Sequence, residues 1–182
     1  LVGDEGEELE VAFVLDKPEG YFELFTLIAH EFFHAWNVKR LRASELGPFD
    51  YGRENPTKLL WFHEGFTSFL QYGLVMKADV AHWSWVSRKL AATWTDNTTR
   101  QGRHEQSLEE SSFDAWIRFY KPTEFSTNST VSYYEKGSLV AWMMDARIRL
   151  ASGGRKGVDD YFRLLWKRFG DGHITVSYTH LT

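Results

Sequence analysis

The stretch HEFFHAWNVKR, residues 30–40, restricts the possible folds of this chain more than any other stretch. It lies in a segment from Tyr21 to about Leu41 whose apolar residues recur at helical spacing, which predicts a helix of about five turns. Apolar side chains occur on nearly all sides of this helix, and such a helix is expected to be buried. The sequence therefore predicts that His30, Glu31 and His34 lie inside the protein.

Most of the remaining chain also has helical patterns. We expect helices at 58–77, 79–94, 111–120, 131–151 and 158–170, with Asp79 as the N-cap of the second of these. Residues 43–57 contain two prolines and two glycines, which predicts an irregular loop. A short strand is expected only at 11–16, VAFVLD. The predicted fold class is therefore mainly α, with at most short N-terminal β structure.

The composition excludes several classes of protein. The chain has 182 residues and 43% hydrophobic content, which suits one globular domain. Its net charge of -4 argues against a nucleic-acid partner, and no apolar run reaches the ~20 residues that a membrane span needs. Cysteine is absent, so any metal would be bound by histidine, carboxylate and water.

The two histidines have the spacing of metal ligands. Residues four apart stand above one another on a helix, so His30 and His34 can both reach one ion at ~2.0–2.1 Å. Glu31 lies about 100° around the helix, where its carboxylate can accept a proton from bound water. The alternative is that both histidines are core residues and Glu31 pairs with Lys39 or Arg40. Burial favours the metal site, because unpaired polar groups in an apolar setting are costly.

A third ligand is expected from LLWFHEGFTSFL, residues 59–70, where Glu64 lies among aromatic residues. Glu64 shares one helical stripe with Thr67, Ser68 and Gln71, whereas His63 faces about 100° away. Two histidines and one carboxylate leave a fourth position for water, as catalytic zinc sites do. A purely structural zinc site would be expected to fill that position with Cys or His.

Several other residues have weaker signals. In SYYEKG, residues 132–137, a phenol near the metal can stabilise an oxyanion, although tyrosine pairs also occur as packing. Asn37 can orient a metal ligand or bond to backbone or solvent. The histidines without a partner at ligand spacing are expected to be solvated or packing residues: His82, His104, His173 and His180.

These segments, in this order, resemble the glycyl aminopeptidase family of zinc peptidases. The resemblance rests on HEFFHAWNVKRLR, ELGPFDY, LLWFHEGFTSFL and SYYEKG, and it covers most of residues 21–169. It implies a partial, thermolysin-like helical catalytic domain at 21–175 that holds one Zn²⁺ through His30, His34 and Glu64. It also implies that Glu31 is the general base and Tyr134 the tyrosine that stabilises the transition state.

The resemblance further implies a zinc-dependent aminopeptidase that removes small N-terminal residues, Gly or Ala, from peptide substrates. A thermolysin-like endopeptidase and a non-catalytic zinc-containing peptide-binding domain remain as alternatives.

The family's N-terminal β-rich domain, its Gly-rich segment and its C-terminal PDZ domain are not found, so we expect them in a longer protein. Residues 1–20 then form a remnant of an upstream segment. The closing VSYTHLT, 176–182, departs from the family pattern and suggests a non-native tail. We expect a bacterial protein, and cytoplasmic, periplasmic and secreted locations all remain open.

Overall fold

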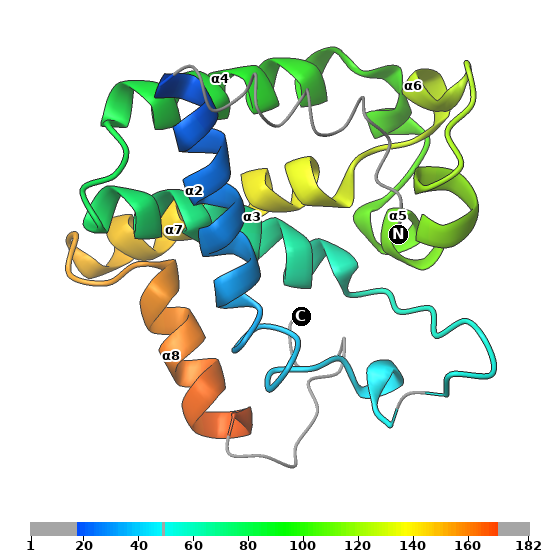
Figure 1. Cartoon of the computed structure of the whole chain (residues 1–182), viewed down its shortest axis with the longest axis horizontal. Helices are drawn as coiled ribbons and strands as arrows, with labels where there is room; N and C mark the ends of the chain where they lie inside the picture. The colour runs from blue at the N-terminus through cyan, green and yellow to red at the C-terminus, as the bar shows by residue number, and fades with distance from the viewer. Residues whose placement is uncertain (1–17, 49, 171–182) are drawn as a thin grey trace, which may run out of the picture.

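The computed structural model describes residues 18–48 and 50–170, and these residues are helical, without a strand. The mainly α fold is therefore confirmed. The strand predicted at 11–16 and the tail at 176–182 lie outside the described residues. With the labels of Figure 1, the elements are α2 (Pro18–Phe33), η1 (Ser44–Leu46), α3 (Leu60–Lys77), α4 (Trp83–Thr99), η2 (Gln101–His104), α5 (Leu108–Phe113), η3 (Ala115–Phe119), α6 (Ser126–Ser129), α7 (Tyr133–Ser152) and α8 (Val158–Phe169).

Helices α3 and α7 form the centre of the fold, and α2 crosses α3 (Figure 1). The α3 and α7 backbones approach closely at two glycines, because a Cβ on Gly65 would lie 2.5 Å from the backbone of Gly137. A Cβ on Gly137 would likewise lie 2.5 Å from the carbonyl oxygen of Trp61. Glycine at both positions therefore lets α7 lie directly against the first turns of α3, which carry Glu64.

The main core lies where α3 meets α7 and α8. Phe62 of α3 stacks on Phe162 of α8, with ring centroids 5.5 Å apart and ring planes at 3°. Burial of such rings is the main driving force that holds these helices together. The buried residues of this cluster are Leu41, Phe62, Phe66, Ala141, Val158, Phe162 and Leu165.

The first described helix is shorter than the sequence predicts. α2 ends at Phe33, and the chain then folds back in a turn, with Leu41 N donating to Trp36 O (2.8 Å) and Val38 N to Leu41 O (2.9 Å). Val38 has φ = 120°, which is incompatible with a helix. The prediction of a continuous helix to about Leu41 was therefore wrong. The turn also buries Leu41 completely, so the apolar pattern that predicted a helix is satisfied without one.

The prediction that α2 is buried on all sides was also wrong. One face, with Phe22, Thr26 and His30, is buried against the rest of the domain, and α3 is the main neighbour of the helix. Leu27, Ile28 and Phe32 are 56%, 54% and 64% exposed. Apolar periodicity indicates which faces can be buried, but it does not indicate which of them has a partner.

Two smaller predictions also need correction. Asp79 has φ = 57° and is not an N-cap; α4 begins at Trp83, and the His82 ring accepts a hydrogen bond from Ser84 N. The helix predicted at 111–120 is two elements, because α5 ends at Phe113 and a π-helical turn, η3, follows. Within the described residues, none of the helices is long and apolar enough to cross a membrane.

Candidate metal centre

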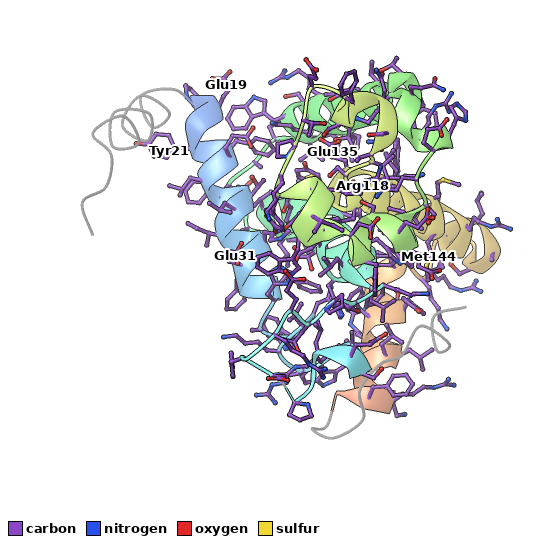
Figure 2. The ribbon with its side chains drawn as sticks, turned by 90° about the vertical axis from the view of Figure 1, so that its right-hand side faces the viewer. Glu19, Tyr21, Glu31, Arg118, Glu135 and Met144 are labelled. Carbon is purple, nitrogen blue, oxygen red and sulfur yellow. The ribbon has the colours of Figure 1, made fainter. Side chains whose placement is uncertain are left out.

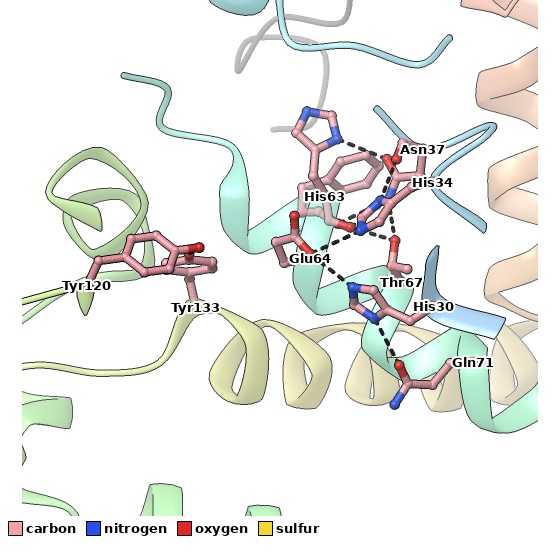
Figure 3. A network of polar contacts seen from close by, with 10 residues as sticks. His30, His34, Asn37, His63, Glu64, Thr67, Gln71, Tyr120 and Tyr133 are labelled. Atoms are coloured by element: carbon pink, nitrogen blue, oxygen red, sulfur yellow. Dashed lines mark hydrogen bonds and ion pairs between the residues drawn. The ribbon is translucent and has the colours of Figure 1, made fainter. Parts of the chain in front are cut away.

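The three predicted ligands meet where α2 crosses α3. His30 is in the last turn of α2, His34 directly follows that helix, and Glu64 is in the first turns of α3. The Nε2 atoms of His30 and His34 lie 3.0 and 3.2 Å from Oε2 of Glu64 (Figure 3). The three ligand atoms all lie within 4.8 Å of one another. The structure therefore places both histidines and the glutamate around one point.

This arrangement fits a zinc ion. Four-coordinate zinc with bonds of ~2.0–2.1 Å holds its ligand atoms about 3.3 Å apart. The separations of 3.0 and 3.2 Å from Glu64 Oε2 to the two imidazoles are close to that value. Nitrogen and carboxylate donors are ligands that zinc accepts, and two histidines with one carboxylate form a three-ligand set. The residues present are thus sufficient to hold the ion without cysteine.

The outer nitrogen of each histidine has its own partner. Nδ1 of His34 donates to the backbone carbonyl of Asn37 at 2.8 Å, and Nδ1 of His30 is 2.8 Å from Oε1 of Gln71. Because Nδ1 keeps its own bond, loss of the Nε2 proton that each ring donates to Glu64 leaves on Nε2 the lone pair that a metal ligand needs. Gln71 was not predicted to have a role, although its place on the Glu64 stripe was a signal that could have found it.

The electrostatics of the cluster keep the glutamate ionised. Burial alone would raise the pKa of Glu64, but the hydrogen bonds from His30 and His34 outweigh it and lower that pKa to about 2. For His34, burial acts to lower the pKa, while the hydrogen bonds to Glu64 and to the Asn37 carbonyl raise it overall. The carboxylate is therefore ready to bind a cation throughout the physiological pH range.

Glu31 lies beside the cluster, in a pocket of about 540 Å³. It is an exposed residue of α2 (Figure 2), so the expectation that it is buried was wrong. It shares this pocket with all three predicted ligands. In the described part of the chain it forms no ion pair with Lys39 or Arg40. The pocket is lined by Glu23, Thr26, Leu27, His30, Glu31, His34, Glu64, Ser68, Gln71 and Tyr134.

The two tyrosines of SYYEKG occupy different environments. Tyr134 lines the pocket, and its ring centroid is 6.1 Å from that of His30. Tyr133 is buried, and its hydroxyl donates to the Tyr120 hydroxyl at 3.3 Å (Figure 3). Burial, with the nearby Glu64 carboxylate and Tyr120, raises the pKa of Tyr134. Of the two tyrosines, Tyr134 is therefore the one that shares the pocket with the three predicted ligands, and its phenol remains a hydrogen-bond donor.

A second pocket, of about 350 Å³, adjoins the first. Glu64 and Tyr134 line both, so the two pockets meet at the metal centre. Trp116 of the π-helical turn η3 and Tyr120, which caps it, form one wall of the second pocket. π-Helical turns frequently occur at functional sites. The sequence analysis did not identify this pocket, because its walls come from segments far apart in the chain.

His63 is directed away from the metal centre, which agrees with the choice of Glu64 as ligand. Its side chain is fully buried, Nδ1 donates to Oδ1 of Asn37 at 2.9 Å, and Nε2 has no hydrogen-bond partner among residues 18–48 and 50–170. Burial lowers the pKa of His63 to about 4. The ring is therefore neutral at pH 7.

The buried His63 should make the stability of the fold depend on pH. The folded protein keeps the ring neutral down to about pH 4, whereas the unfolded chain protonates it near 6.5. Between these values the unfolded state binds more protons, so the free energy of unfolding should fall by about 3 kcal/mol as the pH falls. Urea unfolding at several pH values, with a chelator present, measures this. His63→Phe should remove this part of the pH dependence; an unchanged slope in the variant would assign it to another group.

The end of α2 and the residue that directly follows it supply two histidines, and α3 supplies a carboxylate. The fold and the site together are therefore those of a candidate metal-binding helical domain. Comparison with known proteins specifies the class further. Residues 23–140, more than half of the chain, match the M61 glycyl aminopeptidase family. The chain therefore belongs to the M61 glycyl aminopeptidase family, and the predicted resemblance is confirmed.

A solved structure agrees with this assignment. The crystal structure of an aminopeptidase N family protein from Idiomarina loihiensis matches with a TM-score of 0.84 and 34% sequence identity, over 87% of this chain. The match covers 27% of that protein, so the present chain spans about a quarter of its length. No curated protein matches the chain.

Proposed function

We propose that this chain is the helical catalytic part of a zinc-dependent aminopeptidase that acts on peptides. The observation that carries the proposal is the convergence of His30, His34 and Glu64 on one point, with Glu31 and Tyr134 in the same pocket. One Zn²⁺ per chain would be held by the two imidazoles and the Glu64 carboxylate. Family membership supports this proposal, because it places the chain among glycyl aminopeptidases.

The chain's own residues supply the proton transfers. Zinc, when bound, makes a water more acidic and polarises a carbonyl oxygen. Glu31 takes the proton of the attacking water and then gives it to the leaving amine. Tyr134 donates a hydrogen bond to the carbonyl oxygen as that oxygen gains negative charge. The raised pKa of Tyr134 keeps its proton in place for this role.

The charge of the pocket supports recognition of a free amine. Glu23, which forms an ion pair with Lys89, lines it together with Glu31 and Glu64, so the pocket carries more acidic than basic side chains and a positive α-amine would face carboxylates. The preference for Gly or Ala is carried over from the family.

Comparing the cleavage of free peptides with that of their N-acetylated forms would distinguish an aminopeptidase from an endopeptidase. An aminopeptidase cleaves only the free form, whereas an endopeptidase cleaves both.

The experiment that tests the proposal is zinc analysis of the purified protein and of Glu64→Gln. We expect about one zinc per chain in the parent and much less in the variant, because the variant lacks one of the three ligands that zinc sites use. The control is Glu19→Gln, which changes an exposed glutamate at the start of α2 and should retain zinc. Folded parent protein without zinc would reject the metallopeptidase assignment, and zinc binding without cleavage would favour a peptide-binding domain.

The second pocket should bind the part of the peptide that follows the scissile bond. Trp116 is 56% exposed in its wall, and loss of such an aromatic contact costs about 1 kcal/mol. Trp116→Ala should therefore raise KM about fivefold for tripeptides but leave KM unchanged for single amino-acid amides. Steady-state kinetics with both substrates measures this, and an equal effect on the two would argue against the assignment.

A further inference from the structure

Asn37 forms hydrogen bonds both to His34 and to α3, the helix that carries Glu64. Its side chain is 0% exposed, and Nδ2 donates to the carbonyl oxygen of His63 at 2.9 Å and to Oγ1 of Thr67 at 3.0 Å. Its Oδ1 accepts from Nδ1 of His63 at 2.9 Å. Its backbone carbonyl accepts from Nδ1 of His34 at 2.8 Å (Figure 3).

These bonds join the two elements that supply the ligands. Through its side chain, Asn37 is fixed to α3 at His63, the residue directly before Glu64. Through its backbone, it fixes the ring of His34. A shift of Asn37 relative to α3 would therefore change the distance and angle between the His34 imidazole and the Glu64 carboxylate.

The backbone around Asn37 is strained. The next residue, Val38, has φ = 120°, which is rare for a β-branched side chain. Such a conformation persists only where surrounding contacts enforce it, and these outliers are found mainly at functional sites. Here the contacts are the Asn37 bonds to α3 and the backbone bonds between Val38 and Leu41. The strained turn thus holds the Asn37 carbonyl toward His34.

A second buried asparagine shows that burial by itself does not create such a link. Asn97 is 6% exposed, but its Nδ2 donates to the Thr93 carbonyl of its own helix at 2.9 Å. Within the described part of the chain, its side-chain hydrogen bond therefore links no separate elements. Asn97 provides a matched control for the general cost of removing a buried amide.

We infer that Asn37 is a positioning residue, which sets the geometry of His34 relative to Glu64 and so the affinity for the metal. The inference rests on the proposed function in that it takes His34 and Glu64 as metal ligands. Loss of a group that orients a metal ligand typically weakens metal binding 10- to 100-fold. Asn37→Ala keeps the backbone carbonyl but loses the side-chain bonds that fix the carbonyl in place.

The test is the zinc dissociation constant, measured by competition with a chromophoric chelator on the full chain. Circular dichroism and thermal unfolding of the zinc-free proteins are measured alongside. We expect about 10- to 100-fold weaker zinc binding for Asn37→Ala, and a smaller loss for Thr67→Val, which removes one acceptor. Thr67→Ser, which keeps the hydroxyl, and Asn97→Ala should bind zinc as the parent does.

The inference is overturned if Asn37→Ala is less stable than the parent but binds zinc equally well. If Asn37→Ala does not fold, Thr67→Val decides by the same criterion, because it removes only one of the hydrogen bonds of Asn37. Zinc binding by the parent without peptide cleavage would reject the proposed activity and leave the positioning role intact. A folded parent that binds no zinc would reject both.

Discussion

Glu31→Gln is expected to lower peptide turnover by about 10²- to 10⁴-fold, which is the usual contribution of a general base. Glu31 shares the pocket with the three ligands and forms no ion pair in the described residues that would give it a structural role. Glutamine has the same size and removes only the ability to take the proton. Because Glu31 is exposed, the variant should fold as the parent does.

The measurement is kcat for a free peptide, with zinc content determined on the same samples. Zinc content should equal that of the parent, so that the loss of rate is assigned to proton transfer. Glu19→Gln, on the same helix but outside the pocket, should have parental kcat. Parental turnover in Glu31→Gln would show that the assigned role is wrong.

Tyr134→Phe is expected to lower kcat by about 10²-fold, with a small effect on KM. The phenol acts on charge that develops only in the transition state, and one such donor contributes about 3 kcal/mol. The raised pKa of Tyr134 means that the proton is present throughout the working pH range. Tyr134 lines the pocket and phenylalanine keeps its ring, so the change should leave the core intact.

Tyr133→Phe is the matched control for this prediction. Its ring is buried against Tyr134, with centroids 4.7 Å apart, and its hydroxyl donates to Tyr120. Tyr133 lines the second pocket but not the pocket that contains the three predicted ligands. We expect a small change in stability and nearly parental kcat. If Tyr133→Phe lowered kcat while Tyr134→Phe did not, the roles of the two tyrosines would be reversed.

The cluster of His30, His34 and Glu64 could be anticipated because helix geometry is local. Residues at i and i+4 lie on one face whatever the rest of the fold does, so His30 and His34 could be paired from their spacing. Glu64 could be proposed because a carboxylate among aromatic residues needs a counter-charge. The observed separations of 3.0 and 3.2 Å between Glu64 and the two histidines agree with that reasoning.

The end of α2 could not be predicted from the same pattern. Leu41 is buried, as its place in the apolar periodicity indicates, but it is buried by a turn that starts after Phe33. A helix and a turn can bury the same apolar residue, so burial alone does not distinguish them. The role of Asn37 depends on this turn, because only there does its carbonyl face Nδ1 of His34.

The sequence by itself determined the helical class, the family and the three residues that meet in the candidate metal centre. These depend on periodicity and on residue type at short spacing, which local backbone geometry fixes. Only the tertiary structure decided which faces of α2 are covered, where the second pocket lies, and which groups bond to the outer nitrogens of the two histidines. Those features depend on contacts between α2, α3 and α7, and the close approach of Gly65 to Gly137 is one that no local pattern specifies.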